Sequence, residues 1–114
     1  MSIENAFEQI FDYYRADPSI SAMFKDLDLL VAAKFADTKQ KYYITIKQDQ
    51  EIFLNSTLPD NKPDIKVRIS SEQLLVDLIN GDLPVPEQFK KGKIMITKGL
   101  MKIIKIYRKY VGEP

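Results

Sequence analysis

Apolar and polar residues alternate through the middle of the chain with the two-residue period of strands that have one face in water. Ile44 and Ile46, for example, alternate with Thr45 and Lys47. Apolar residues recur at every second position at 51–55, 65–70 and 93–97 too, with Phe53 and Met95 at outward positions. Residues 29–36, in contrast, are apolar at nearly every position, as in a central strand. The first strands are joined by short polar turns, which favour antiparallel neighbours. The pattern therefore predicts five strands in a largely antiparallel sheet.

Helical periodicity predicts helices at 2–15, 18–24, 71–79, 86–91 and 100–111. Ser2 is a cap for the first helix, Ser70 or Ser71 caps the third, and Asn80-Gly81 ends the third. Apart from Met101, the apolar arc of the last helix spans about 160°, which is wider than packing on a flat sheet requires. The pattern alone leaves two interpretations open. The surplus apolar surface either docks in a groove of the core or lines a ligand cavity.

The composition limits the chemistry. A chain of 114 residues is expected to form a single domain, 1–114. It contains neither histidine nor cysteine, which excludes Ser-His-Asp triads, Cys-His pairs and zinc sites. No apolar run approaches the roughly 20 residues of a membrane span, and neither end reads as a secretory or peroxisomal address. We therefore expect a cytoplasmic protein without a metal or other cofactor.

The net charge is only +1, but its distribution along the chain is uneven. Residues 90–109 hold eight basic side chains and no acidic one. Such a run is either a solvated helix face or a surface attracted to anionic head groups. Nucleic acid is a weaker interpretation, because the pI is about 7.8 and no recognised binding motif is present.

A family resemblance is carried by about 50 residues of the second half, namely 63–72, 74–75, 78–81, 83, 89, 92–96 and the closing apolar helix. This segment resembles a sterol carrier protein type-2 domain, whereas residues 1–60 match in layout only. The resemblance implies an α+β fold, with a five-stranded, largely antiparallel sheet covered on one face by helices and an apolar tunnel between the layers. It also implies a non-catalytic carrier of fatty acids, acyl-CoA, phospholipids or sterols.

The resemblance, with the apolar pattern, predicts a set of ligand-binding residues on the sheet and helices: Ile44, Ile46, Leu75, Leu78, Ile79, Phe89, Ile96, Leu100, Met101, Ile103, Ile104 and Tyr107. Head-group or membrane contacts are expected from Lys90, Lys91, Lys98 and Lys102. Two departures from the family pattern concern the prolines at 84 and 86 and the Lys98-Gly99 turn. The second alters the turn at the tunnel mouth.

Two other functions stay open at this point. The chain could be an accessory subunit or domain of an acyl-thioester or lipid-metabolising enzyme, with the carboxylate pairs Asp26/Asp28 or Glu4/Glu8, or the amine of Lys34, as its only acid–base candidates. It could also be a basic surface module that binds a membrane, a protein or nucleic acid through residues 90–109. We favour a lipid or fatty acyl ligand, transient contact with an anionic membrane, no catalysis and no nucleic acid.

Overall fold

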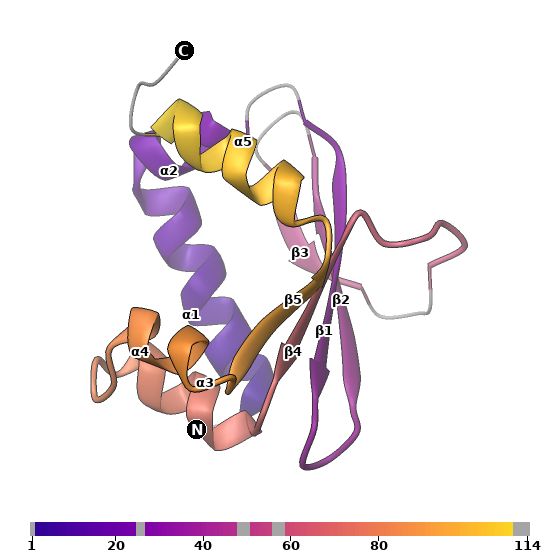
Figure 1. Ribbon diagram of the computed structural model, residues 1–114. Helices are drawn as coiled ribbons and strands as arrows, with labels where there is room; N and C mark the ends of the chain where they lie inside the picture. Colours follow the sequence, from indigo (N-terminus) through magenta and orange to yellow (C-terminus); the bar gives the residue numbers. More distant parts are fainter. Residues whose placement is uncertain (1, 25–26, 48–50, 56–58, 111–114) are drawn as a thin grey trace.

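A computed structural model describes residues 2–24, 27–47, 51–55 and 59–110 (Figure 1). Within these residues the helices are α1 (Ile3–Ala16), α2 (Pro18–Met23), α3 (Glu72–Ile79), α4 (Val85–Lys90) and α5 (Leu100–Tyr110). The strands are β1 (Leu29–Phe35), β2 (Lys41–Ile46), β3 (Ile52–Leu54), β4 (Ile65–Ile69) and β5 (Ile94–Lys98). All the helices lie on one side of the sheet, so the predicted α+β class and one-sided cover are confirmed.

The strand order is β3-β2-β1-β4-β5, which places the most apolar strand, β1, at the centre as predicted. β1 pairs antiparallel with β2 but parallel with β4. The sheet is therefore mixed, and the parallel pair was not anticipated. The chain reaches β4 through residues 59–64, which lie on the side of the sheet away from the helices (Figure 1).

Local signals place the helix ends. Ser2 Oγ accepts a hydrogen bond from the Asn5 N–H at 3.2 Å, and Ser71 Oγ accepts one from the Leu74 N–H at 3.0 Å. Gly81, with a φ of +79°, follows the end of α3. The two serine caps supply partners for N–H groups that have none within the helix. The predicted turn at 48–50 lies outside the described residues.

The apolar positions of the sequence predict one broad face for the first helix that includes both Tyr13 and Tyr14, but Tyr13 is 61% exposed. Successive helix positions are 100° apart, so neighbouring tyrosines cannot share one narrow contact. Tyr14 takes the inward position, with its ring 5.5 Å from that of Phe24. Burial raises the pKa of the Tyr14 hydroxyl.

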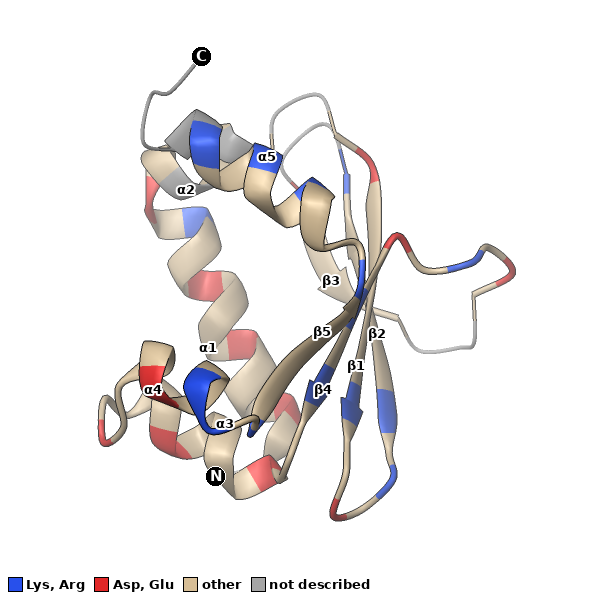
Figure 2. Cartoon of the chain, in the orientation of Figure 1, with Lys and Arg blue, Asp and Glu red and all other residues tan. Residues whose placement is uncertain are grey.

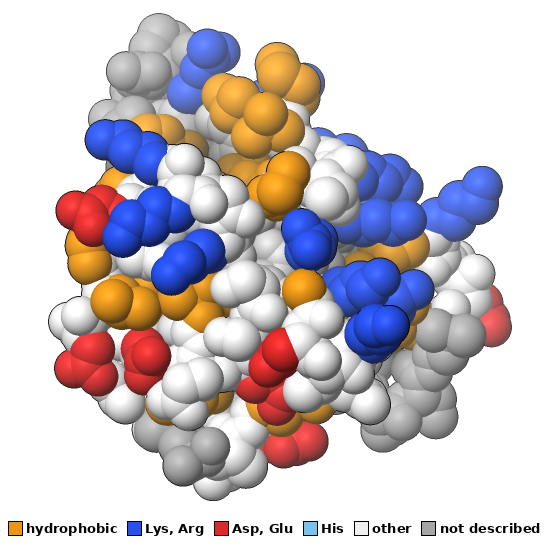
Figure 3. Space-filling model, turned by 60° about the horizontal axis from the view of Figure 1, so that its bottom comes forward, with side chains coloured by type: hydrophobic (Ala, Val, Ile, Leu, Met, Phe, Trp, Pro, Cys, Tyr) orange, Lys and Arg blue, Asp and Glu red, His pale blue; other side chains and the backbone are white. Residues whose placement is uncertain are grey.

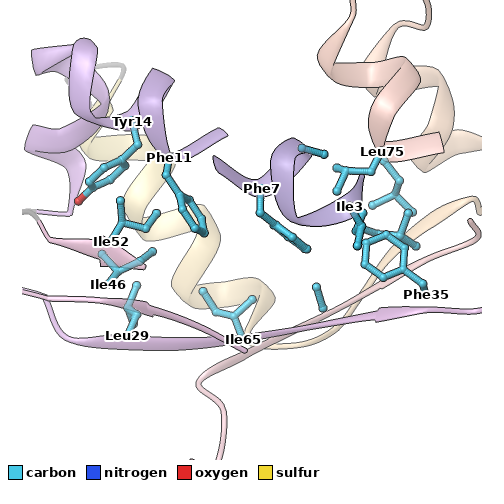
Figure 4. Close-up of a cluster of buried hydrophobic side chains, with 14 of the residues drawn as sticks. Ile3, Phe7, Phe11, Tyr14, Leu29, Phe35, Ile46, Ile52, Ile65 and Leu75 are labelled. Atoms are coloured by element: carbon cyan, nitrogen blue, oxygen red, sulfur yellow. The ribbon is translucent and has the colours of Figure 1, made fainter. Parts of the chain in front are cut away.

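The two faces of the sheet differ in chemistry. The inner face, toward the helices, carries Leu29, Val31, Ala33, Phe35, Tyr42, Ile44, Ile46, Ile52, Leu54, Ile65, Val67, Ile69, Ile94 and Ile96. The outer face carries Leu30, Ala32, Lys34, Lys41, Tyr43, Thr45, Phe53, Lys66, Arg68, Met95 and Lys98. Figure 4 shows rings from α1 pointing toward the inner face, where Phe7 lies 6.2 Å from Phe35 between ring centres.

Candidate functional site

The inner face of the sheet is buried at both ends and only half-buried in its middle. The strand register arranges its side chains in four rows across the strands. In the first row Ile52, Ile46 and Leu29 are buried, and in the fourth row Phe35, Ile69 and Ile94 are buried. The two middle rows differ, because only Ile65 and Ala33 are buried there; the remaining members are half-buried, namely Leu54, Ile44, Val31, Tyr42, Val67 and Ile96.

This distribution follows from where the helices lie. α2 and α5 cover one end of the sheet, and α3 and α4 cover the other (Figure 1). Inward-facing strand residues are normally the most buried positions of a sheet covered by helices. Half-buried apolar side chains in the middle rows therefore mark a place where the two layers are not in full contact.

Helix residues with similar exposure border this middle region. Leu78 and Ile79 of α3 and Ile103 and Ile104 of α5 are half-buried. Three of them, Leu78, Ile79 and Ile103, pack against the edge of the buried cluster. The region thus has an apolar floor on the sheet and apolar borders on two helices.

An apolar hollow of about 340 Å³ opens where α5 meets the starts of β1 and β4. Its walls are Leu27, Leu29 and Ile106, and its rim is formed by charged residues, namely Asp28, Asp64, Lys102 and Lys105. A volume near 300 Å³ is at the lower end of the range for small-molecule sites. The tunnel that the resemblance implies stays a prediction, since what lies at this place is an open hollow.

Asp64 fixes the rim of this hollow. Its Oδ2 accepts a hydrogen bond from the Leu30 N–H at 2.9 Å, and its Oδ1 accepts one from Lys102 Nζ at 3.0 Å. The Leu30 N–H lowers the pKa of the Asp64 carboxyl, and Lys102 and Lys98 lower it further against the opposing effect of burial. One carboxylate thereby ties α5 to β1 and β4. Sequence reasoning used Asp64 only as part of the resemblance and gave it no role.

The turn that leads into α5 has little freedom. Gly99 has a φ of +83°, which side chains other than glycine rarely adopt. A Cβ on Gly99 would overlap the Asp64 carbonyl oxygen and press on Ile65. This close approach sets the start of α5 against β4, at the turn where the family pattern differs.

The predicted ligand-binding residues fall into three groups. Ile46 and Leu75 lie in the buried core. Ile44, Leu78, Ile79, Ile96, Ile103 and Ile104 are half-buried around the middle region. The most exposed group, at 43–64%, is Phe89, Leu100, Met101 and Tyr107. Val31 and Val67 of the middle rows, and Leu27 and Leu29 of the hollow, were not singled out. Val67 was recognised as inward, but only the register shows that its row is half-buried.

The predicted head-group lysines are divided between two places. Lys90 ends α4 and Lys91 follows it, at the opposite end of the helical layer from α5 (Figure 2). Lys98 donates a hydrogen bond to the Pro63 carbonyl at 2.6 Å, and Lys102 is paired with Asp64. Their role in head-group contact stays a prediction.

The described residues contain no cluster of acidic side chains that could hold a metal ion. Glu4 and Glu8 are exposed on α1, so this pair forms no enclosed site, and Asp26 of the other pair lies outside the described residues. Lys34 is exposed on the outer face rather than enclosed in an apolar pocket. No helix within the described part of the chain is long and apolar enough to cross a membrane.

Comparison with known proteins finds similarity in fold rather than in sequence. No family model and no curated protein sequence matches the chain. The solution structure of palmitated sterol carrier protein 2 like 2 from Aedes aegypti matches with a TM-score of 0.65 and 17% identity, over 96% of this chain and 95% of that one. The chain has the sterol carrier protein 2 fold. The apo form of sterol carrier protein 2 from Yarrowia lipolytica also matches, with a TM-score of 0.54 and 20% identity, over 84% of this chain and 89% of that one.

A second kind of neighbour is a larger enzyme. The stereoselective inverting sec-alkylsulfatase from Pseudomonas sp. matches with a TM-score of 0.56 and 17% identity, over 76% of this chain. This chain spans 13% of that enzyme, and 16% of a double-mutant form of it. The sterol carrier protein 2 fold therefore occurs both as a protein of about this length and as a small part of a longer chain.

Proposed function

We propose that the protein is a non-catalytic lipid carrier that holds one acyl chain against the middle rows of the inner face, in the cytoplasm. The observation that carries the proposal is the exposure pattern of that face, with buried rows at both ends and half-buried Val31, Ile44, Val67 and Ile96 between them. A covering layer that simply filled the core would bury the middle rows most. The fold supports a lipid ligand, since one neighbour was solved in palmitated form.

The energetics suit reversible carriage. Burying about a dozen methylenes gains on the order of 10 kcal/mol, at about 0.8 kcal/mol each. Loss of chain and overall freedom removes several kcal/mol of that gain. The remainder corresponds to an affinity near micromolar, which permits both loading and release. Fatty acid, acyl-CoA, phospholipid and sterol are all compatible with an apolar floor of this kind.

The test is uptake of a fluorescent fatty acid from solution by purified, delipidated protein. We expect saturable binding of one ligand near micromolar concentration. Val67→Phe would fill the middle region and lower the affinity about tenfold or more, whereas Val85→Phe, on the exposed side of α4, would leave it unchanged. Absence of uptake, or an equal effect of both variants, would contradict the proposal.

The partial match to an alkylsulfatase favours a second candidate, a domain that presents apolar substrate to a lipid-metabolising enzyme. The two candidates differ in what happens after binding. A carrier alone should move fluorescent fatty acid from donor to acceptor vesicles, whereas a presenting domain should bind it without speeding that transfer. The transfer rate therefore decides between them.

A further inference from the structure

The outer face of the sheet brings like charges together. The register places Lys34 directly opposite Lys41 on one side and Arg68 on the other. Lys66 lies opposite Lys98. Figure 2 shows the basic segments of β2, β1 and β4 side by side at one level of the sheet. Neighbouring strands are about 4.8 Å apart, so the Cα atoms of Lys41, Lys34 and Arg68 lie within about 10 Å along one row.

Within the described strands, no acidic residue occupies an outer-facing position, and the five cations are all exposed. Lys98 interacts with Asp64, which precedes β4. The ion pairs among the described residues join Arg15 to Asp12 and Lys102 to Asp64, and neither involves the outer face. Like charges directly opposite one another destabilise a sheet. Like charges kept opposite one another at a cost in stability point to a function for the charges.

The face also has a hollow and two exposed apolar side chains. The hollow, of about 340 Å³, lies over Ala32 and is bordered by Lys34, Lys41, Tyr43, Lys66 and Arg68. Ala32 is short while its row neighbours Tyr43 and Lys66 are long, which explains the depression. Phe53 on β3 and Met95 on β5 are 40% and 45% exposed at opposite edges of the same face.

We propose that the outer face of the sheet docks on an anionic lipid bilayer, with a head-group phosphate over Ala32 and with Phe53 and Met95 entering the interface. The cations spread over β2, β1, β4 and β5 rather than along one track, which suits a plane more than a strand of nucleic acid. Basic side chains gather on the flank of the molecule that carries the sheet, and a second group lies on the opposite flank (Figure 3). Acidic side chains lie on α1, α3 and α4 and on loops around the sheet (Figure 2), whereas the charged outer-facing positions of the described strands are all basic, which favours that face toward a negative surface.

The inference extends the proposed function, because a carrier must visit a membrane, but it can be tested without cargo. Delipidated protein is sedimented with vesicles of phosphatidylcholine alone or with one third phosphatidylglycerol, in about 0.1 M and 0.5 M salt. We expect binding only to the anionic vesicles and only at the lower salt. Lys34→Gln with Lys66→Gln should lower the partition coefficient about thirtyfold, since each basic residue near such a surface contributes about fivefold.

The competing surface carries Lys90 and Lys91, and Lys90→Gln with Lys91→Gln makes the same change in charge. We expect this pair to lower binding less than threefold. A loss equal to or greater than that of the outer-face pair would overturn the proposal. Binding to a short DNA duplex that is tighter than binding to vesicles, and that the outer-face pair abolishes, would also overturn it.

Lys34→Glu separates docking from folding, because the new carboxylate would lie between Lys41 and Arg68. We expect a protein at least as stable as the parent that binds anionic vesicles at least thirtyfold less well. A stable variant with unchanged vesicle binding would overturn the proposal. Fatty acid uptake measured without vesicles should be unaffected, so failure of docking and failure of the carrier function give different results.

Discussion

The two faces of one sheet are built from the same strands and are put to opposite uses. On the inner face, rows of apolar side chains are buried at both ends and half-buried in the middle. On the outer face, basic side chains stand opposite one another and no helix covers them. The inner face supplies the buried core, whereas the like charges that stand opposite one another on the outer face oppose folding. The difference shows that strand alternation separates the residues needed for folding from those free to serve another purpose.

The largest expected effect is on stability, when a buried aromatic ring is removed from the inner face. The matched removal of a ring from the outer face should have little effect. Phe35→Ala empties a fully buried site and should lower the free energy of unfolding by about 3–5 kcal/mol. Phe53→Ala, on the outer face, should change it by less than about 1 kcal/mol. Urea unfolding monitored by circular dichroism measures both. Similar losses for the two variants would break the comparison between the faces.

Two glycines of similar backbone conformation test the close approach of α5 to the sheet. Gly99→Ala adds a Cβ that overlaps Asp64, and should lower the free energy of unfolding by about 2–4 kcal/mol. The new Cβ of Gly81→Ala has nothing within 4 Å. This variant should lower the free energy of unfolding by only about 1 kcal/mol, because alanine disfavours the left-handed φ at this position. Because Gly99 also positions α5, its variant should weaken fatty acid uptake, and Gly81→Ala should not.

Asp64, which contacts α5 through Lys102, should make the stability of the fold depend on pH. Its folded-state pKa is lowered, so its contribution is complete above the ordinary carboxyl range, about pH 5, and is lost as the pH falls through the lowered value. Asp64→Asn should lower the free energy of unfolding by about 1 kcal/mol at pH 7. It should also make stability less dependent on pH below about 4. Thermal unfolding across that range measures the effect, and parallel curves for the two proteins would contradict it.

The smallest expected effect is a gain in stability on the outer face. Lys34→Glu replaces two repulsive cross-strand pairs with attractive ones and should raise the free energy of unfolding by about 0.5–1 kcal/mol. The gain should shrink in 1 M salt, where charges on the surface are screened. A loss of stability at low salt would mean that the repulsion inferred from the register is not present.

Much of the fold could be predicted because it depends on neighbours in sequence. Caps at Ser2 and Ser71, the helix stop at Gly81 and the inward alternation of Ile65, Val67 and Ile69 involve residues a few positions apart. The wide apolar face of α1 was harder. The periodicity of the sequence predicted that both Tyr13 and Tyr14 point inward. In the structure only Tyr14 does so, and its ring packs against Phe24.

The candidate site was predicted in part for the same reason. Ile44 and Ile96 were expected on the tunnel floor, and the structure places both in the half-buried middle rows. The rows themselves depend on which strands pair, and the parallel pairing of β1 with β4 joins segments more than 30 residues apart. The role of Asp64 likewise depends on Leu30 and Lys102, both more than 30 residues away.

The sequence by itself determined the strands and helices, their inward and outward sides, and the absence of histidine and cysteine chemistry. These features follow from periodicity and composition, which are local or additive. The tertiary structure alone decided that the middle of the inner face is half-buried and that Lys34 stands between Lys41 and Arg68. Both depend on register, because which residues stand opposite one another is set by the pairing of strands that are distant in sequence, and only long-range packing fixes that pairing.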